Sequence, residues 1–191
     1  DFSGIHPGPT DAWAGNRLHT FTITFDLAEE AAGVYELRLD LIDTHASVPP
    51  ALRVQVNDAT AEIKLPTGTG DIALLRPETG KARPVRFCFD GKALKKAGNR
   101  VTITNTAGSW LLYDAVTFFQ LPAGVIELQA EPTIFFVEKD GRLRQEFNIQ
   151  AFGVLSDQPL QIEVKAGDTV VGTCPLGKPS LGIVSGPILI D

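Results

Sequence analysis

The sequence lacks long apolar runs and is short of basic residues, and each shortage excludes a class of function. The longest unbroken apolar run falls far short of the ~20 residues that a membrane-spanning helix needs. The 17 basic residues are outnumbered by 23 acidic ones, and the formal net charge of −6 offers no positive surface to a nucleic-acid backbone. We therefore expect neither a membrane nor a nucleic acid as a partner.

Methionine is absent and cysteine is scarce. Because the 191-residue chain begins with Asp1 and contains no methionine, we expect it to arise by processing or from a longer polypeptide. Cys88 and Cys174 are too few for a disulfide framework, and neither has zinc-ligand spacing. We interpret them as two buried thiols, with a bridge between domains as the alternative.

Helical periodicity is also missing, and strict alternation of apolar and polar residues takes its place. The alternation is clearest in three segments: Phe21–Phe25, Val34–Leu41 and Leu52–Val56. Strands that bury only one face belong to antiparallel sheets. With turn signals between about eight such strands, the sequence predicts an all-β fold built as a β-sandwich.

A breaker cluster, Pro122-Ala123-Gly124, divides the chain into two predicted domains. The first covers residues 1–121, and it contains a hairpin signal at Asn57-Asp58 and a long loop from Thr67 to Pro84. The second covers residues 122–191 and continues with strands, beginning with Val125–Ala130. It is shorter than the roughly 100 residues of an immunoglobulin-type sandwich. We therefore expect a smaller immunoglobulin- or fibronectin-like sandwich that is incomplete here or is completed by another segment.

Motifs for catalysis are absent from the sequence. It contains no GxSxG elbow, no P-loop, no dinucleotide-binding glycine pattern and no HExxH zinc motif. The carboxylates Asp40 and Asp43 could form a glycosidase pair only if the fold placed them correctly, and solvated strand ends are the simpler interpretation. We predict no catalytic residue and no metal ligand in this chain, although a structural calcium ion is compatible with it.

The two tryptophans lie beside turn signals and are the best candidates for recognition. The apolar face of a sugar ring stacks on indole, while neighbouring polar groups bind its hydroxyls. We predict a carbohydrate-binding site in which Trp13 and Trp110 stack on sugar rings and Arg17 and His45 donate to hydroxyls or to a uronate carboxylate. The alternative interpretation is that each indole fills the core where the N-terminal segment meets the sandwich.

Three segments of the sequence resemble a known family. They are Leu52–Asn57, Leu94–Ile103 and Ser109–Val116. Together they are similar to the galactose-binding-like sandwich, and above all to the carbohydrate-binding-module-like third domain of rhamnogalacturonan lyases. The resemblance covers about residues 10 to 121, and its motifs specify turns and core positions as much as a ligand site. It implies a jelly-roll accessory module.

This resemblance shapes the functional expectation. It implies a non-catalytic module of a polysaccharide lyase or glycoside hydrolase, secreted or periplasmic, whose partners are carbohydrate and the catalytic domain of the parent chain. In the lyases a fibronectin-like domain precedes the module, whereas a second sandwich follows it here, so the parent enzyme could differ. Two alternatives stay open: spacer domains without any ligand, and a fragment that contributes to a glycosidase active site.

Overall fold

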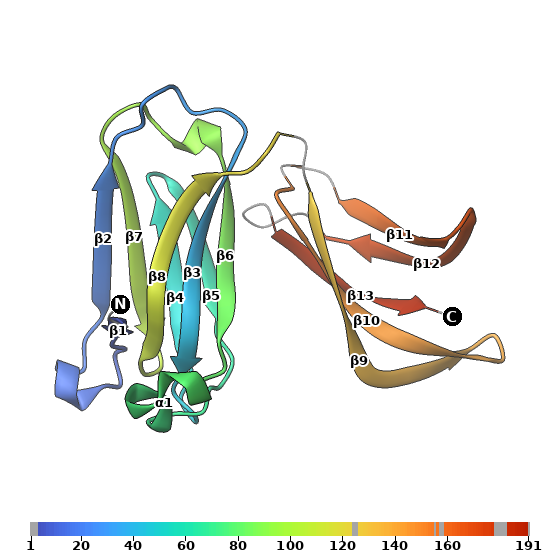
Figure 1. The fold of residues 1–191 in the computed structure, drawn as a ribbon, viewed down its shortest axis with the longest axis horizontal. Helices are drawn as coiled ribbons and strands as arrows, with labels where there is room; N and C mark the ends of the chain where they lie inside the picture. The colour runs from blue at the N-terminus through green and yellow to red at the C-terminus, as the bar shows by residue number, and fades with distance from the viewer. Residues whose placement is uncertain (1–3, 124–125, 155, 157–158, 178–182, 191) are drawn as a thin grey trace. The chain divides into compact units, whose positions relative to one another are not determined.

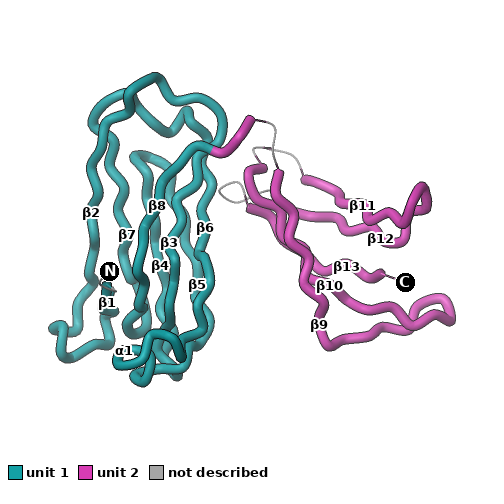
Figure 2. The backbone as a smooth tube through the Cα atoms, viewed as in Figure 1, with its two compact units in different colours: residues 1–120 teal, residues 121–191 magenta. Residues whose placement is uncertain are grey.

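The computed structural model describes residues 4–123, 126–154, 156, 159–177 and 183–190. The regular structure is almost entirely β-strand, and the paired strands of these ranges are antiparallel (Figure 1). The predicted all-β class is therefore confirmed. The chain divides into two compact units, Asp1–Gln120 and Leu121–Asp191 (Figure 2). No helix in the described ranges combines the length and apolar character needed to cross a membrane.

Unit 1 is a β-sandwich of two four-stranded sheets. The first sheet has the order β1-β8-β3-β6, with β1 at Gly4–His6, β8 at Leu111–Gln120, β3 at Val34–Thr44 and β6 at Arg83–Asp90. The second has the order β2-β7-β4-β5, with β2 at His19–Phe25, β7 at Asn99–Ala107, β4 at Ala51–Val56 and β5 at Ala59–Lys64.

The period-two pattern explains how these sheets pack. Alternate residues of β3 and β4 face the interior and are at most 2% exposed: Leu37, Leu39, Leu41, Leu52, Val54 and Val56. Burying each of these side chains stabilises the fold by about 1.5–3 kcal/mol relative to leaving it in water. The residues between them face outward and are mostly polar, so each sheet has one apolar face to bury.

Most connections in unit 1 cross from one sheet to the other. The exception is the hairpin between β4 and β5, whose two-residue turn is the predicted Asn57-Asp58, with Asn57 at φ 50°. The crossing connections gather at the two ends of the sandwich. One end carries the short helices η1 (Ala12–Ala14), α1 (Ile72–Leu75) and η2 (Pro77–Thr79), and η3 (Gly91–Ala93) lies in the connection between β6 and β7 (Figure 1).

Two details differ from the sequence prediction. The sequence indicates no strand before Trp13, whereas the structure has the three-residue strand β1 there; three residues are too few to show alternation. The sequence of Lys92–Ala97 predicts one helical turn, whereas the structure has the 3₁₀ helix η3, which begins at Gly91 and ends at Ala93. Here the side chain of Asp90 caps the helix by accepting a hydrogen bond from the Lys92 N–H at 2.9 Å.

Unit 2 also has two sheets. The three-stranded sheet has the order β13-β10-β9, with β13 at Ile183–Ile190, β10 at Arg142–Phe152 and β9 at Glu127–Lys139. The two-stranded sheet pairs β11 (Leu160–Ala166) with β12 (Thr169–Leu176). The predicted strand Val125–Ala130 thus corresponds to the start of β9, and Val125 itself lies outside the described residues, as does Gly124 of the predicted boundary.

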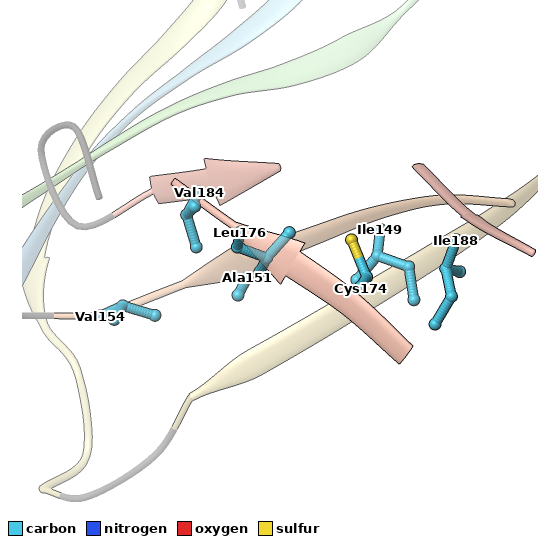
Figure 3. Packing of buried hydrophobic residues seen from close by; sticks show 7 residues of the cluster. All are labelled: Ile149, Ala151, Val154, Cys174, Leu176, Val184 and Ile188. Atoms are coloured by element: carbon cyan, nitrogen blue, oxygen red, sulfur yellow. The ribbon is translucent and has the colours of Figure 1, made fainter. Parts of the chain in front are cut away.

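Residues from both sheets of unit 2 form one small core (Figure 3). Its buried members are Ile149, Ala151, Val154, Cys174, Leu176, Val184 and Ile188. The inward side chains of β11, by contrast, are only partly buried against this cluster: Leu160, Ile162 and Val164. The two cysteines, Cys88 in unit 1 and Cys174 in unit 2, are both buried as thiols.

Candidate functional site

Four connecting segments meet at the end of unit 1 that carries α1. They are residues 7–18, 45–50, 65–82 and 107–110. Backbone hydrogen bonds join them: Thr10 N–H donates to the Gly108 carbonyl at 3.2 Å, and Ser109 N–H donates to the Val48 carbonyl at 3.0 Å. Gly68 N–H donates to the His45 carbonyl at 3.4 Å. These bonds make a single structured surface from loops that are far apart in the sequence.

Trp13 lies in the first of these segments and its side chain is 65% exposed. A buried carboxylate holds the turn beneath it: Asp11 accepts a hydrogen bond from the Gly8 N–H at 2.8 Å and another from the Ser109 hydroxyl. Gly8 approaches the 107–110 segment so closely that a Cβ there would lie 2.3 Å from the Gly108 carbonyl oxygen. The exposed indole of Trp13 therefore lies on a turn that the hydrogen bonds of buried Asp11 hold in place.

Two histidines fix the same turn from its other side. The Nε2 of His6 donates to the His19 carbonyl at 2.9 Å, and the Nε2 of His19 donates to the Ala14 carbonyl at 3.0 Å. His6 is fully buried and stacks on Phe21, with ring centroids 4.1 Å apart. Burial lowers the pKa of His6 and outweighs the opposing effect of its hydrogen bond to His19. Both imidazoles thus hold the turn of Trp13 in place.

Arg17 is exposed and follows Trp13 in the same connection, after the left-handed pair Gly15 and Asn16. Leu18, the next residue, is also exposed. The structure therefore places two of the predicted site residues, Trp13 and Arg17, in one segment. The guanidinium of Arg17 thus provides hydrogen-bond donors in the same segment as the exposed indole.

His45 lies in the second segment and is half-buried. Its Nδ1 accepts hydrogen bonds from the N–H groups of Ser47 and Val48, at 3.2 and 3.0 Å, so this nitrogen organises its own loop. Its Nε2 makes no hydrogen bond within the described residues. His45 therefore has one ring nitrogen available for a ligand.

The stacking role predicted for Trp110 needs correction. Its side chain is only 3% exposed and lies edge-on to the ring of His45, with centroids 6.0 Å apart at 77°. A buried indole cannot receive a sugar ring, so the alternative interpretation, a core position, describes this residue. Trp110 instead supports His45: the backbone N–H of His45 donates a hydrogen bond to the backbone carbonyl of Trp110 at 3.3 Å.

A second buried carboxylate, Asp43, organises the long 65–82 segment. It accepts hydrogen bonds from the N–H of Thr69 at 3.0 Å, from the Thr69 hydroxyl, and from the N–H of Lys81 at 3.4 Å. Burial raises the pKa of Asp43, but these hydrogen bonds and one from Thr44 outweigh it, and the net shift is downward. Gly68 passes so close that a Cβ there would lie 2.1 Å from the carboxylate.

The interpretation of Asp43 as a solvated strand end is wrong, because this residue is fully buried and accepts hydrogen bonds from Thr69 and Lys81. The structural role of Asp11 was not predicted. For both residues the nearest sequence signals are weak: an Asp three residues after Gly8, and an Asp at the end of an alternating strand. Their main partners, Ser109 and Thr69, lie 98 and 26 residues away along the chain. No group of three or more His, Cys, Asp or Glu side chains suited to a metal ion was found among the residues that the structure describes.

A comparison with protein families agrees with the β-sandwich of unit 1. Residues 7–118 match a protein family described as CBM-like, polysaccharide lyase family 4, domain III. The matched range contains all four connecting segments at the end of unit 1 that carries α1, which we call the loop end, and it stops within β8. A comparison with curated proteins gave no match.

Proposed function

The chain belongs to the CBM-like family, polysaccharide lyase family 4 domain III, and on this premise we propose that unit 1 binds carbohydrate at the end that carries Trp13. As a member of that family it is an accessory module, and the proposed part is that the module makes contact with sugar. The single observation that carries the proposal is the exposed indole of Trp13 on a turn fixed by Asp11 and His19.

A rigid platform matters because binding has an entropic cost. A side chain or loop that is already ordered loses little freedom when the ligand arrives. The C–H face of a pyranose would stack on Trp13, and Arg17 and the Nε2 of His45 would bind hydroxyls or a carboxylate. Trp110 would act beneath the surface by supporting His45.

The same proposal extends to the rest of the protein. The strand orders β1-β8-β3-β6 and β2-β7-β4-β5 support a jelly roll of the galactose-binding-like type for residues 1–121. For residues 122–191 we propose an immunoglobulin-like sandwich that another segment completes, because the inward side chains of β11 are only partly buried. The partner would be a polysaccharide-cleaving catalytic domain of the same parent chain, in a secreted or periplasmic enzyme.

The test is calorimetric titration of the chain with pectic and mannan oligosaccharides at millimolar concentration. We expect Trp13→Ala to weaken binding by about tenfold or more, as loss of a central aromatic anchor does. Phe135→Ala is the matched control, because it removes an aromatic side chain, 61% exposed, from unit 2. No heat with any sugar, or equal losses in both variants, would refute the proposal.

A second candidate, a spacer without ligand, is favoured by two observations. Trp110 is buried, and both Asp11 and Asp43 serve the structure of the loop end. A spacer would show no sugar-dependent heat in the wild-type chain, whereas it would still depend on these residues for stability. The titration therefore separates the two candidates.

A further inference from the structure

The outer face of the sheet β2-β7-β4-β5 carries an ordered array of polar side chains. Val101 and Ile103 of β7 are buried, so the alternate residues Thr102 and Thr104 face outward. Strand pairing aligns these residues in two rows across the sheet: Thr22, Thr102, Gln55 and Thr60 in one, and Thr20, Thr104, Arg53 and Glu62 in the other. Polar side chains thus repeat about every 4.8 Å across strands and roughly 7 Å along them. In the second row the hydroxyls of Thr20 and Thr104 hydrogen-bond each other at 2.8 Å, so the hydroxyls of Thr22, Thr102 and Thr60 in the first row are the ones open to a ligand.

A pocket of about 220 Å³ lies where this face meets the connection before β7. Its lining combines two cations, one acid and three neutral polar side chains: Lys95, Arg100, Asp58, Gln55, Asn57 and Thr102. Neither Lys95 nor Arg100 forms an ion pair within the described residues. The pocket therefore has two cationic groups that the protein itself does not neutralise.

Two asparagines hold the backbone of both cationic residues. Asn99, which is 1% exposed, accepts a hydrogen bond from the Lys95 N–H at 2.8 Å and donates one to the Lys95 carbonyl at 2.6 Å. Asn57 accepts from the Arg100 N–H at 3.0 Å and donates to Asn99 at 3.0 Å. The two positive side chains therefore project from a rigid frame, which lowers the entropic cost of binding.

The charge of this face is opposite to that of the whole chain. The exposed charged groups on the face and its pocket are the bases Arg53, Lys64, Lys95 and Arg100 and the acids Glu62 and Asp58. Arg53 and Glu62 neutralise each other at 2.7 Å. On a chain of net charge −6, a local excess of positive charge favours an anionic ligand.

We propose that this face binds an extended anionic polysaccharide. Lys95 and Arg100 bind a carboxylate or sulfate of one residue of the glycan, and Thr22, Thr102 and Thr60 hydrogen-bond the hydroxyls of the neighbouring residues. This site is separate from the loop end of Trp13, and it does not depend on the function proposed there. No bond is made or broken, so the site only binds.

The test compares three probes by calorimetry: alginate oligosaccharides for carboxylate, dextran sulfate oligosaccharides for sulfate, and neutral dextran. We expect at least one acidic probe to bind, and Lys95→Glu/Arg100→Glu to weaken that binding by about tenfold or more, since hydrogen bonds to charged groups are lost. Lys96→Glu, one residue away and outside the pocket, is the matched control and should change affinity less than about twofold.

The hydroxyl rows have their own control. Thr22→Val/Thr102→Val removes two hydroxyls from one row at almost constant shape, whereas Thr117→Val removes one exposed hydroxyl from the other sheet. We expect weaker binding of the acidic probe only in the first variant. Lys95→Gln/Arg100→Gln replaces the double glutamate variant if the latter does not fold.

Each result decides the proposal. Binding of either acidic probe that depends on Lys95 and Arg100 supports it, and the probe that binds identifies the anion. Absence of binding by both acidic probes at millimolar concentration overturns it, and so does an equal loss in Lys96→Glu. If Trp13→Ala abolishes acidic binding and the pocket variants do not, the anion binds at the loop end and this proposal is wrong.

Discussion

Asp11 and Ser109 lie 98 residues apart in the sequence, and the hydroxyl of Ser109 donates a hydrogen bond to the carboxylate of Asp11. Asp11 is 5% exposed and belongs to the segment of Trp13, whereas Ser109 lies two residues before β8. This contact fastens the N-terminal connection of unit 1 to the connection between β7 and β8. The exposed indole of Trp13 takes its position from that contact.

Replacing Asp11 should loosen the turn of Trp13. Asp11→Asn keeps the shape but weakens both accepted hydrogen bonds, and we expect a loss of about 1–3 kcal/mol in the free energy of unfolding. Asp58→Asn, an exposed turn residue, is the control and should cost less than about 0.5 kcal/mol. Urea denaturation measures both, and equal losses would show that Asp11 does not hold the turn.

Asp43 should make stability depend on pH in the acid range. Its pKa in the folded protein lies below the ordinary 3.8, so the unfolded chain takes up the proton more readily. The stabilisation is complete above the ordinary pKa and is lost as the pH falls through the folded pKa. We expect Asp43→Asn to be less stable than wild type at neutral pH, by about 1–3 kcal/mol.

The difference between the two proteins should shrink as the pH falls from about 5 to about 2, because protonation removes the same charge from the wild type. Chemical denaturation at a series of pH values measures it. A difference that stays constant over this range would show that the charge of Asp43 contributes nothing.

His6 should also make stability depend on pH, over a higher pH range than Asp43. As with Asp43, stability should be lost as the pH falls. Burial lowers its pKa below the ordinary 6.5, so protonation favours the unfolded chain, and stability is lost as the pH falls from 6.5 through the folded pKa. In His6→Gln the amide can still donate to the His19 carbonyl. We expect this variant to lose less stability than wild type between about pH 7 and about pH 5; parallel profiles would contradict the assignment.

Asn99 should be important for stability and for the pocket beside it. Its buried amide makes hydrogen bonds to both backbone groups of Lys95, and Asn99→Ala leaves those groups unpaired. The hydrogen bond that Asn99 accepts from Asn57 is lost as well, and we expect a loss of about 2–3 kcal/mol from the three missing hydrogen bonds. Thr24→Ala, at an exposed position of β2, is the comparison in thermal unfolding, and a loss there as large as at Asn99 would refute this role.

Local patterns in the sequence were sufficient for most of the strands. Alternation at Phe21–Phe25 and Val34–Leu41 identified β2 and β3, and Asn57-Asp58 identified the hairpin of β4 and β5. Such patterns are visible because each strand exposes one face to water and buries the other. The strand β1 has only three residues, and its pairing with β8 depends on a segment more than a hundred residues away.

The candidate site was less predictable for a related reason. A turn signal beside each tryptophan could not show which indole is exposed, because exposure depends on what packs there in three dimensions. Trp110 immediately precedes β8 and is buried. Trp13 is exposed on a turn that is held by hydrogen bonds from the side chains of His19 and Ser109. The roles of Asp11 and Asp43 likewise depend on partners that no local pattern identifies.

The most direct measurement of the central claim is quenching of tryptophan fluorescence by acrylamide, with and without oligosaccharide, in wild type and Trp13→Phe. The wild-type signal should contain an accessible component from Trp13 and a protected one from Trp110. We predict that a bound oligosaccharide protects the accessible component and that Trp13→Phe lacks both this component and the sugar effect. Quenching of Trp13 that is unchanged at saturating oligosaccharide would contradict the account.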